Sequence, residues 1–200
     1  MDETPTPNAD WAFPVDTTIP AGSFVAVVVC SRENVAGDIL GTDFGFTGLT
    51  DDQGNTYTLY QQETQTNELT VVGIYTGTLS TELAAGEDMT VSINNLGNFA
   101  NHAVVLVFDS QTATAAFSSS QGSGAVSETL TATDNSVTVH AVSSSSVTDF
   151  GTHDYTLLAE NLDAGCSLSV SAKSTSAGST TNTLTGGSFG NYASLMVCFD

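Results

Sequence analysis

The amino-acid sequence predicts an all-β protein, an antiparallel β-sandwich that is jelly-roll-like and built from two similar halves. Short apolar or alternating segments recur along the 200 residues, and turn-forming residues separate them about every eight to twelve positions. No stretch of any length has the 3.6-residue period of an amphipathic helix. The third observation is an internal repeat. The tripeptide Tyr-Thr-Leu stands at 57–59 and again at 155–157, and the segments after the two copies also align.

The repeat divides the chain into two units. An extended arm at 1–15 is expected first, followed by one sandwich domain at 16–200. Its halves cover 16–110 and 127–200, and the Ser-, Ala-, Thr- and Gly-rich segment 110–126 is expected to connect them. Two small sandwiches side by side are the alternative. A single domain is favoured because a half with so few strands would leave a large apolar face uncovered.

Individual strands are predicted from apolar runs and alternation. Residues 23–30 are almost continuously apolar and β-branched, as in a strand buried on both faces, and 136–142 is their counterpart in the second half. The longest irregular stretch, 31–50, is an insertion in the first half. Further strands are expected at about 56–62, 69–75, 88–94, 103–109, 128–133, 155–160, 166–173, 180–185 and 192–199.

The charge balance excludes several kinds of partner. Twenty-two acidic residues against two basic ones, Arg32 and Lys173, give a net charge of −20. Nucleic acid and anionic membranes are poor partners, because binding either requires basic groups. Such acidity suits a saline medium or the solubility of a particle-surface protein. The chain has no run of 18 apolar residues and no secretory signal at its N-terminus, so we expect neither a transmembrane helix nor export through a signal peptide.

Three cysteines, an odd number, argue against a disulfide framework. Cys30 and Cys198 lie in predicted core strands and are expected to be buried, whereas Cys166 opens a strand and is expected to be the most accessible. All three are predicted to be reduced. No histidine has another His or Cys at zinc-ligand spacing, and His140 is expected to pack within its strand.

The turn before the first Tyr-Thr-Leu gathers oxygen ligands. Asp51, Asp52 and Asn55 surround Gly54, but the spacing lacks the complete calcium loop with its distal Glu. A β-turn accounts for these residues, and a weak Ca²⁺ site is the alternative. No other metal site and no cofactor are expected.

No motif indicates an enzyme. Serine is abundant, but the chain has no Gly-x-Ser-x-Gly elbow. Glu63, Glu68 and Glu160 lie near predicted strand ends, and nothing singles out two of them as the carboxylate pair of a glycosidase. One Trp and five Tyr leave a carbohydrate-binding face open, although these aromatic residues also fit a core or a sheet face.

One succession of turns and strands resembles a β-sandwich domain of bacterial and phage structural proteins. It comprises Ile19-Pro20-Ala21-Gly22 before an apolar strand, the turn and strand at 51–58, the alternating strand at 69–75, and 86–93. The chain is similar in style to small acidic decoration or cement proteins on the heads of tailed phages. This resemblance implies a non-enzymatic structural protein, made in the host cytoplasm and carried on the virion surface. Its partner is then the major capsid protein, and we expect a homo-oligomer, with a trimer favoured.

The candidate contact residues follow from the acidity. A protein without basic patches is expected to attach to a capsid through apolar and backbone contacts. The arm either packs on its own domain or reaches a neighbouring subunit, where an extended segment can add to a sheet edge. A carbohydrate-binding or adhesive module is the second hypothesis, and an enzyme is the third. The partner-binding candidates are Trp11 and Phe13 in the arm and Phe44, Phe46 and Leu49 in the irregular stretch.

Overall fold

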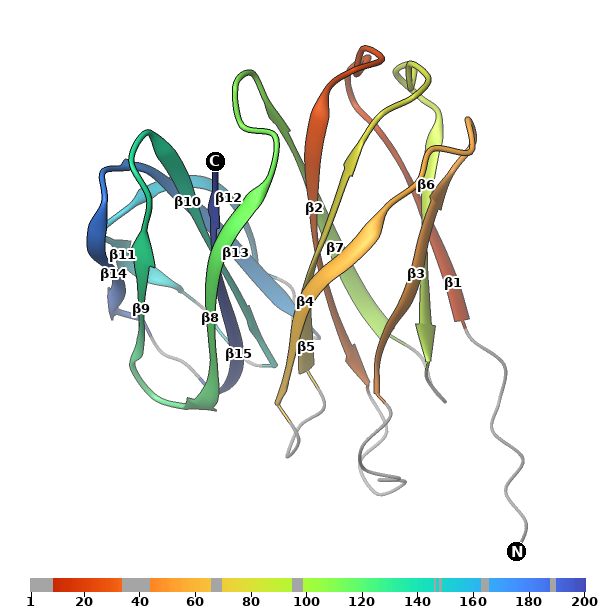
Figure 1. Ribbon diagram of the computed structural model, residues 1–200. Helices are drawn as coiled ribbons and strands as arrows, with labels where there is room; N and C mark the ends of the chain where they lie inside the picture. Colours follow the sequence, from red (N-terminus) through yellow and green to blue (C-terminus); the bar gives the residue numbers. More distant parts are fainter. Residues whose placement is uncertain are drawn as a thin grey trace, which may run out of the picture.

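The computed structural model describes residues 9–33, 44–65, 70–94, 99–145, 147, 149–162, 166–187 and 190–200. These residues form fifteen β-strands and no helix (Figure 1). The first half contains β1 (Ala9–Pro14), β2 (Phe24–Glu33), β3 (Gly45–Asp51), β4 (Thr58–Gln65), β5 (Thr70–Thr78), β6 (Asp88–Asn94) and β7 (Phe99–Phe108). The rest of the chain contains β8 (Thr114–Ser123), β9 (Val126–Ala132), β10 (Ser136–Ser144), β11 (Gly151–His153), β12 (Thr156–Leu162), β13 (Ser167–Thr175), β14 (Gly178–Gly186) and β15 (Asn191–Phe199).

The strands pair into four antiparallel sheets, which confirms the predicted antiparallel β-sandwich. Sheets β1-β6-β3 and β4-β5-β2-β7 belong to the first half, and sheets β11-β14-β9 and β12-β13-β10-β15-β8 to the second. Figure 1 shows four layers, with the two larger sheets inside and the three-stranded sheets outside. Among the described strands, no sheet combines strands of the first half with strands of the second half. This pairing does not establish a jelly roll and matches the alternative of two small sandwiches side by side.

The internal repeat extends to the whole topology. Strands β1 to β7 correspond in order to β9 to β15, because each has the same neighbours in its own half. Strand β8 is the exception, since it pairs with the outer edge of β15, and no described strand pairs with that edge of β7. The expectation that 110–126 is only a connection is therefore wrong. Strand β8 was not predicted because its Ala and Ser residues give little hydrophobic alternation.

The described part of the N-terminal arm is a strand of its own domain. Strand β1 pairs with β6 from Ala9 opposite Ile93 to Pro14 opposite Asp88. A proline is tolerated here because β1 is an edge strand. Packing on its own domain is thus what the structure shows for residues 9–14, while residues 1–8 lie outside the described part.

The central strands of both large sheets are buried on both faces. In β2, Ala26, Val28 and Cys30 contact the second half, whereas the alternate valines contact the outer sheet of the first half. Leu168 of β13 and Leu195 of β15 belong to the same cluster as Ala26, so the two halves share one apolar core. This arrangement explains the almost continuous apolar run in β2, since a strand covered on both sides has no polar face.

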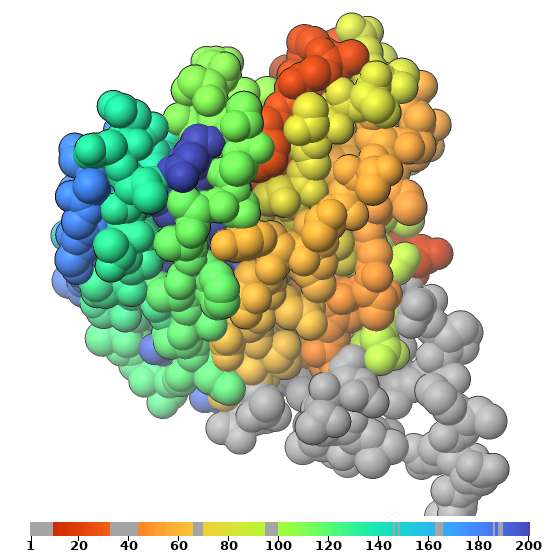
Figure 2. All heavy atoms as spheres, viewed as in Figure 1, coloured from red at the N-terminus to blue at the C-terminus, as the bar shows by residue number. Residues whose placement is uncertain are grey.

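The seam between the halves closes at one edge with aromatic rings. Strand β4 of the first half contacts β8 of the second, and Figure 2 shows these segments, orange and green, packed against each other. The rings of Tyr60 and Phe117 meet edge to face there, with centroids 6.0 Å apart. At the opposite edge the two halves do not match strand for strand, which creates the groove described below.

Substitution of two glycines with positive φ tests how closely the surrounding backbone packs against each of them. We expect Gly151→Ala to destabilise the protein clearly more than Gly22→Ala. Both residues have left-handed backbone, at φ +76° and +87°, which costs a non-glycine residue about 1–2 kcal/mol. A Cβ at Gly151 would also lie 2.6 Å from the nitrogen of Gly187, whereas a Cβ at Gly22 meets nothing within 4 Å.

Urea denaturation of the two variants and the wild type measures the difference directly. Equal losses of unfolding free energy would contradict the close approach of Gly151 to the end of β14.

Candidate functional site

The predicted ion site at the end of β3 is a closed hydrogen-bonded turn. Asp51 Oδ1 accepts the backbone N–H groups of Gln53 and Asn55 at 3.0 and 2.9 Å, and its Oδ2 accepts Asn55 Nδ2 at 2.8 Å and the Tyr57 hydroxyl at 2.6 Å. Asn55 Oδ1 in turn accepts the backbone N–H groups of Ser80 and Thr81. The oxygens that would bind a cation are therefore engaged by hydrogen-bond donors.

These bonds also set the charge state of the turn. Burial alone would raise the pKa of Asp51, but hydrogen bonds from Tyr57 and Asn55 outweigh it and hold that pKa below its usual value. Asp52 accepts the backbone N–H of Asp88 at 2.9 Å. Among the described residues, no group of three His, Cys, Asp or Glu side chains is placed to hold a metal ion.

A buried polar network lies between the two sheets of the second half. His140 of β10 shares a hydrogen bond of 2.8 Å with Ser194 Oγ of β15. Asn182 Nδ2 of β14 donates to His140 Nδ1 at 2.8 Å and to Ser171 Oγ of β13 at 2.9 Å. His140 is 1% exposed, and the other three residues are 0% exposed. The sequence prediction that His140 packs within its strand is thus confirmed.

The order Ser194–His140–Asn182 looks like a catalytic triad, but its hydrogen bonds exclude that role. Asn182 Oδ1 accepts the backbone N–H groups of Asp154 and Tyr155, which fixes Nδ2 toward the imidazole. His140 Nδ1 must then accept, and Nε2 carries the proton and donates to Ser194. A base that activates serine needs a free lone pair on that nitrogen. Burial lowers the pKa of His140 to about 3, so the ring is neutral and the network is structural.

Two of the three cysteines, Cys30 and Cys166, meet at the contact between the halves. The Sγ atoms of Cys30 and Cys166 are 3.3 Å apart, and Ser143 Oγ lies 3.5 Å from the second of them. All three cysteines are free and buried, so the expected accessibility of Cys166 is wrong. It enters β13 within the shared core. Burial raises the pKa of Cys30, and the hydrogen bond from Cys30 lowers the pKa of Cys166.

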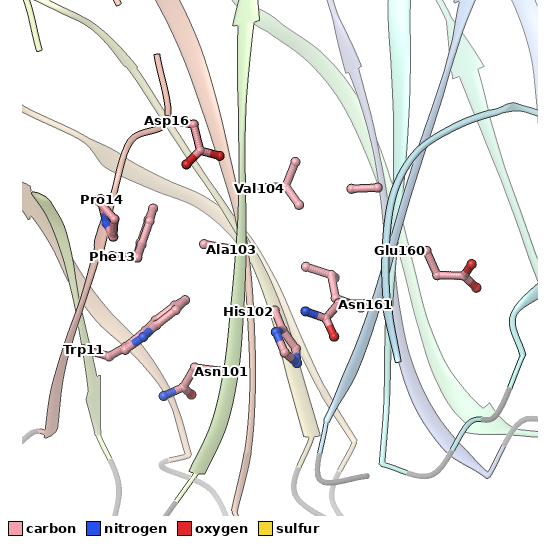
Figure 3. Close-up of a pocket in the computed structure, with 12 residues that line it drawn as sticks. Trp11, Phe13, Pro14, Asp16, Asn101, His102, Ala103, Val104, Glu160 and Asn161 are labelled. Atoms are coloured by element: carbon pink, nitrogen blue, oxygen red, sulfur yellow. The ribbon is translucent and has the colours of Figure 1, made fainter. Parts of the chain in front are cut away.

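A groove of about 400 Å³ lies beside β7, between β1 of the first half and β12 of the second (Figure 3). This volume falls in the range of about 300–1,000 Å³ that is typical of ligand sites. Twelve residues line the groove: Trp11, Phe13, Pro14, Asp16, Asn101, His102, Ala103, Val104, Ala159, Glu160, Asn161 and Leu168.

Strand β7 divides the groove along its length. Asn101 and Ala103 point toward β1, and His102 and Val104 point toward β12, as Figure 3 shows. His102 donates from Nε2 to the Cys166 carbonyl at 2.9 Å, because a carbonyl can only accept. The Oδ1 atom of Asn101 is buried and has no hydrogen-bond partner.

The two walls differ in chemistry. The rings of Trp11 and Phe13 form an aromatic wall with centroids 4.9 Å apart. On the opposite wall, Asn161 lies beside Leu168, and the Glu160 carboxylate accepts the Phe150 N–H at 3.3 Å. Figure 3 shows that this carboxylate points away from the aromatic wall.

The structure separates the sequence-predicted contact residues into two groups. Trp11 and Phe13 line the groove, but Phe46 and Leu49 are only 3% and 6% exposed and belong to the core of the first half. Phe44 packs against the same core. The expectation that Phe46 and Leu49 are partner contacts is wrong, because residues 45–51 form strand β3 and both side chains pack in the core of the first half.

The sequence analysis missed the residues that β7 contributes. Asn101 and His102 form a polar pair directly before the apolar run that ends the strand. A polar pair inside a strand that is otherwise apolar indicates an edge that reaches solvent or a ligand, and this signal was present in the sequence.

Comparison with known proteins does not place the chain in a family. No protein-family model, no curated protein and no solved structure matches it. In the part of the chain described, no helix is long and apolar enough to cross a membrane. The class of protein is therefore described from its own fold and groove. It is a double β-sandwich with a candidate binding groove at the junction of its halves.

The buried His140 predicts a specific pH dependence. Its pKa is about 3 in the folded chain and 6.5 ordinarily, so between these values only the unfolded chain binds the proton. Acidification from pH 7 to 5 should therefore lower the unfolding free energy by up to about 1.4 kcal/mol per pH unit. His140→Gln should flatten this dependence.

Urea titrations at pH 7, 6 and 5 measure the slope. A His140→Gln variant with an unchanged slope would show that His140 does not carry the effect.

The cysteine geometry predicts slow thiol chemistry in the native protein. With all three thiols buried, a disulfide reagent should react slowly under native conditions and titrate three thiols after denaturation without reductant. Detection of a single thiol would mean that a disulfide exists, and the contact between Cys30 and Cys166 would be its first candidate position.

Proposed function

We propose that this chain is a non-enzymatic structural protein that decorates the outer surface of a phage capsid and attaches through the groove beside β7. The groove is the observation that carries the proposal, because its chemistry suits contact with a protein surface. An aromatic wall, a strand edge and amide side chains provide apolar and hydrogen-bonding contacts. Its His102 is held by a backbone carbonyl and its Glu160 by a backbone N–H.

The charge of the chain supports the same kind of attachment. The net charge is −20, and both basic residues are engaged within the fold. Arg32 Nη1 donates to the Ser145 carbonyl at 2.6 Å, and Lys173 lies 5.6 Å from the centre of the Tyr155 ring. Attachment therefore uses apolar and backbone contacts, and it favours a partner surface that is neutral or basic.

The architecture suits a protein that stays folded on the outside of a particle. Two sandwiches share a core, and both inner sheets are covered on both faces. The remaining parts of the proposal rest on the resemblance to decoration proteins. They are the major capsid protein as partner, a homo-oligomer with a trimer favoured, and the virion surface as location.

The proposal is tested by co-sedimentation with capsid shells. The shells are assembled from the major capsid protein encoded near the gene for this chain, and the purified chain is added at increasing concentration. We expect saturable binding with a fixed ratio to the capsid subunit. Failure to bind, or a gene neighbourhood without capsid genes, would overturn the proposal. A glycan array run in parallel tests the carbohydrate-binding alternative.

A further inference from the structure

The two halves differ at one equivalent edge. Strands β7 and β15 are the last strands of their halves, and each pairs on one side with the long central strand, β2 or β10. On its other side β15 pairs with β8, from Asn191 opposite Ser123 to Phe199 opposite Thr114. No described strand occupies the matching position beside β7. The second half thus shows what this edge accepts, namely an added antiparallel strand.

The edge of β7 is accessible where it borders the groove. Its residues from Asn101 to Val104 are partly exposed, whereas Val27, Val28 and Val29 of the neighbouring strand β2 are fully buried. A strand edge presents unpaired backbone N–H and C=O groups, and a further strand would lie about 4.8 Å from it. That position falls inside the groove, between the walls that β1 and β12 provide.

We propose that the free edge of β7 binds an extended segment of a protein partner as an added antiparallel strand, in the position that β8 takes beside β15. The inference rests on the proposed function only in taking the partner to be a protein. Main-chain hydrogen bonds to β7 supply affinity in this mode, and alternate side chains supply specificity.

The walls indicate which side chains the segment carries. Successive residues of an added strand point to opposite faces, so one set meets the rings of Trp11 and Phe13 and the other set meets Asn161. Small or apolar residues suit the aromatic wall.

Charge favours a segment that is neutral or basic. Asp16 lines the groove on the side of β1, and no Lys or Arg of the described residues lines it. A second copy of the chain is a poor occupant, because each copy carries a net charge of −20. The occupant is therefore an extended, neutral-to-basic segment of a different protein.

The test uses a synthetic peptide as probe. Its sequence is Lys-Thr-Val-Thr-Val-Thr-Val-Thr-Val-Lys, with blocked ends, and the matched control has the same side chains but N-methyl groups at alternate residues. We expect the first peptide to bind and to slow hydrogen exchange of the β7 amides. The N-methylated peptide should not, because it lacks the N–H groups that strand addition requires.

Two variants test the walls, and a third is the control. Trp11→Ala should weaken peptide binding about tenfold or more, as truncation of a central aromatic contact does. Asn161→Arg, at an exposed position, should weaken binding of the lysine-ended peptide and strengthen binding of a glutamate-ended one. Ala12→Arg changes the outward face of β1 and should leave binding unchanged, since Ala12 is exposed and does not line the groove.

The outcomes separate this inference from the proposed function. Binding to capsid shells that Trp11→Ala and Asn161→Arg leave unchanged, without peptide protection of β7, overturns the inference and the groove as the attachment site, and keeps only the capsid-decorating role. Peptide binding that protects the β7 amides, together with no binding to capsid shells, keeps the inference and overturns the proposed function. Saccharide binding that Trp11→Ala abolishes, together with no peptide binding, also overturns the inference.

Discussion

The packing of the two large sheets against each other is the contact on which the rest of the structure depends. Each half has an inner sheet that is covered on one face by its own three-stranded sheet and on the other face only by the opposite half. In β2 the alternate residues Ala26 and Val28 have no cover except the second half. Apolar area removed from water stabilises by roughly 25 cal/mol per Å². The two halves are thus joined by the same force that forms each of them.

The groove is a consequence of how these two sheets are aligned. The five-stranded sheet has β8 at one end, which lies over β4, while β15 contacts β4 and β5 and β13 contacts β2 and β7. Strand β12 is the next strand outward, and no described strand of the first half lies beneath it. The five-stranded sheet has one strand more than the four-stranded sheet that it covers. Strands β12 and β1 extend past the edge of β7, and the groove lies between them. One additional strand at one end of the sheet therefore opens a site at the other end.

Much of the fold could be predicted from the sequence, because buried strands and their turns leave local patterns. The run at 23–30 and the repeated Tyr-Thr-Leu indicated the central strands and the two halves. Strand β8 was not predicted, because Ser and Ala side chains do not form such a pattern. Cys166 was misjudged because its burial comes from the other half of the molecule. The groove itself could not be predicted, since Trp11, Asn101 and Asn161 lie on three different sheets and are brought together only by the packing of those sheets.

The polar layer of the second half makes the two halves unequal in their tolerance of mutation. Between the sheets of the first half, one aliphatic residue can replace another of similar volume for less than about 1.5 kcal/mol. Around Asn182 each donor is matched to one acceptor, so a single replacement leaves a buried polar atom unsatisfied at a cost of about 1–3 kcal/mol. Neutral drift is thereby open to the first half, whereas the second half must change its residues in compensating pairs. Two copies of one topology are in this way held to different evolutionary constraints.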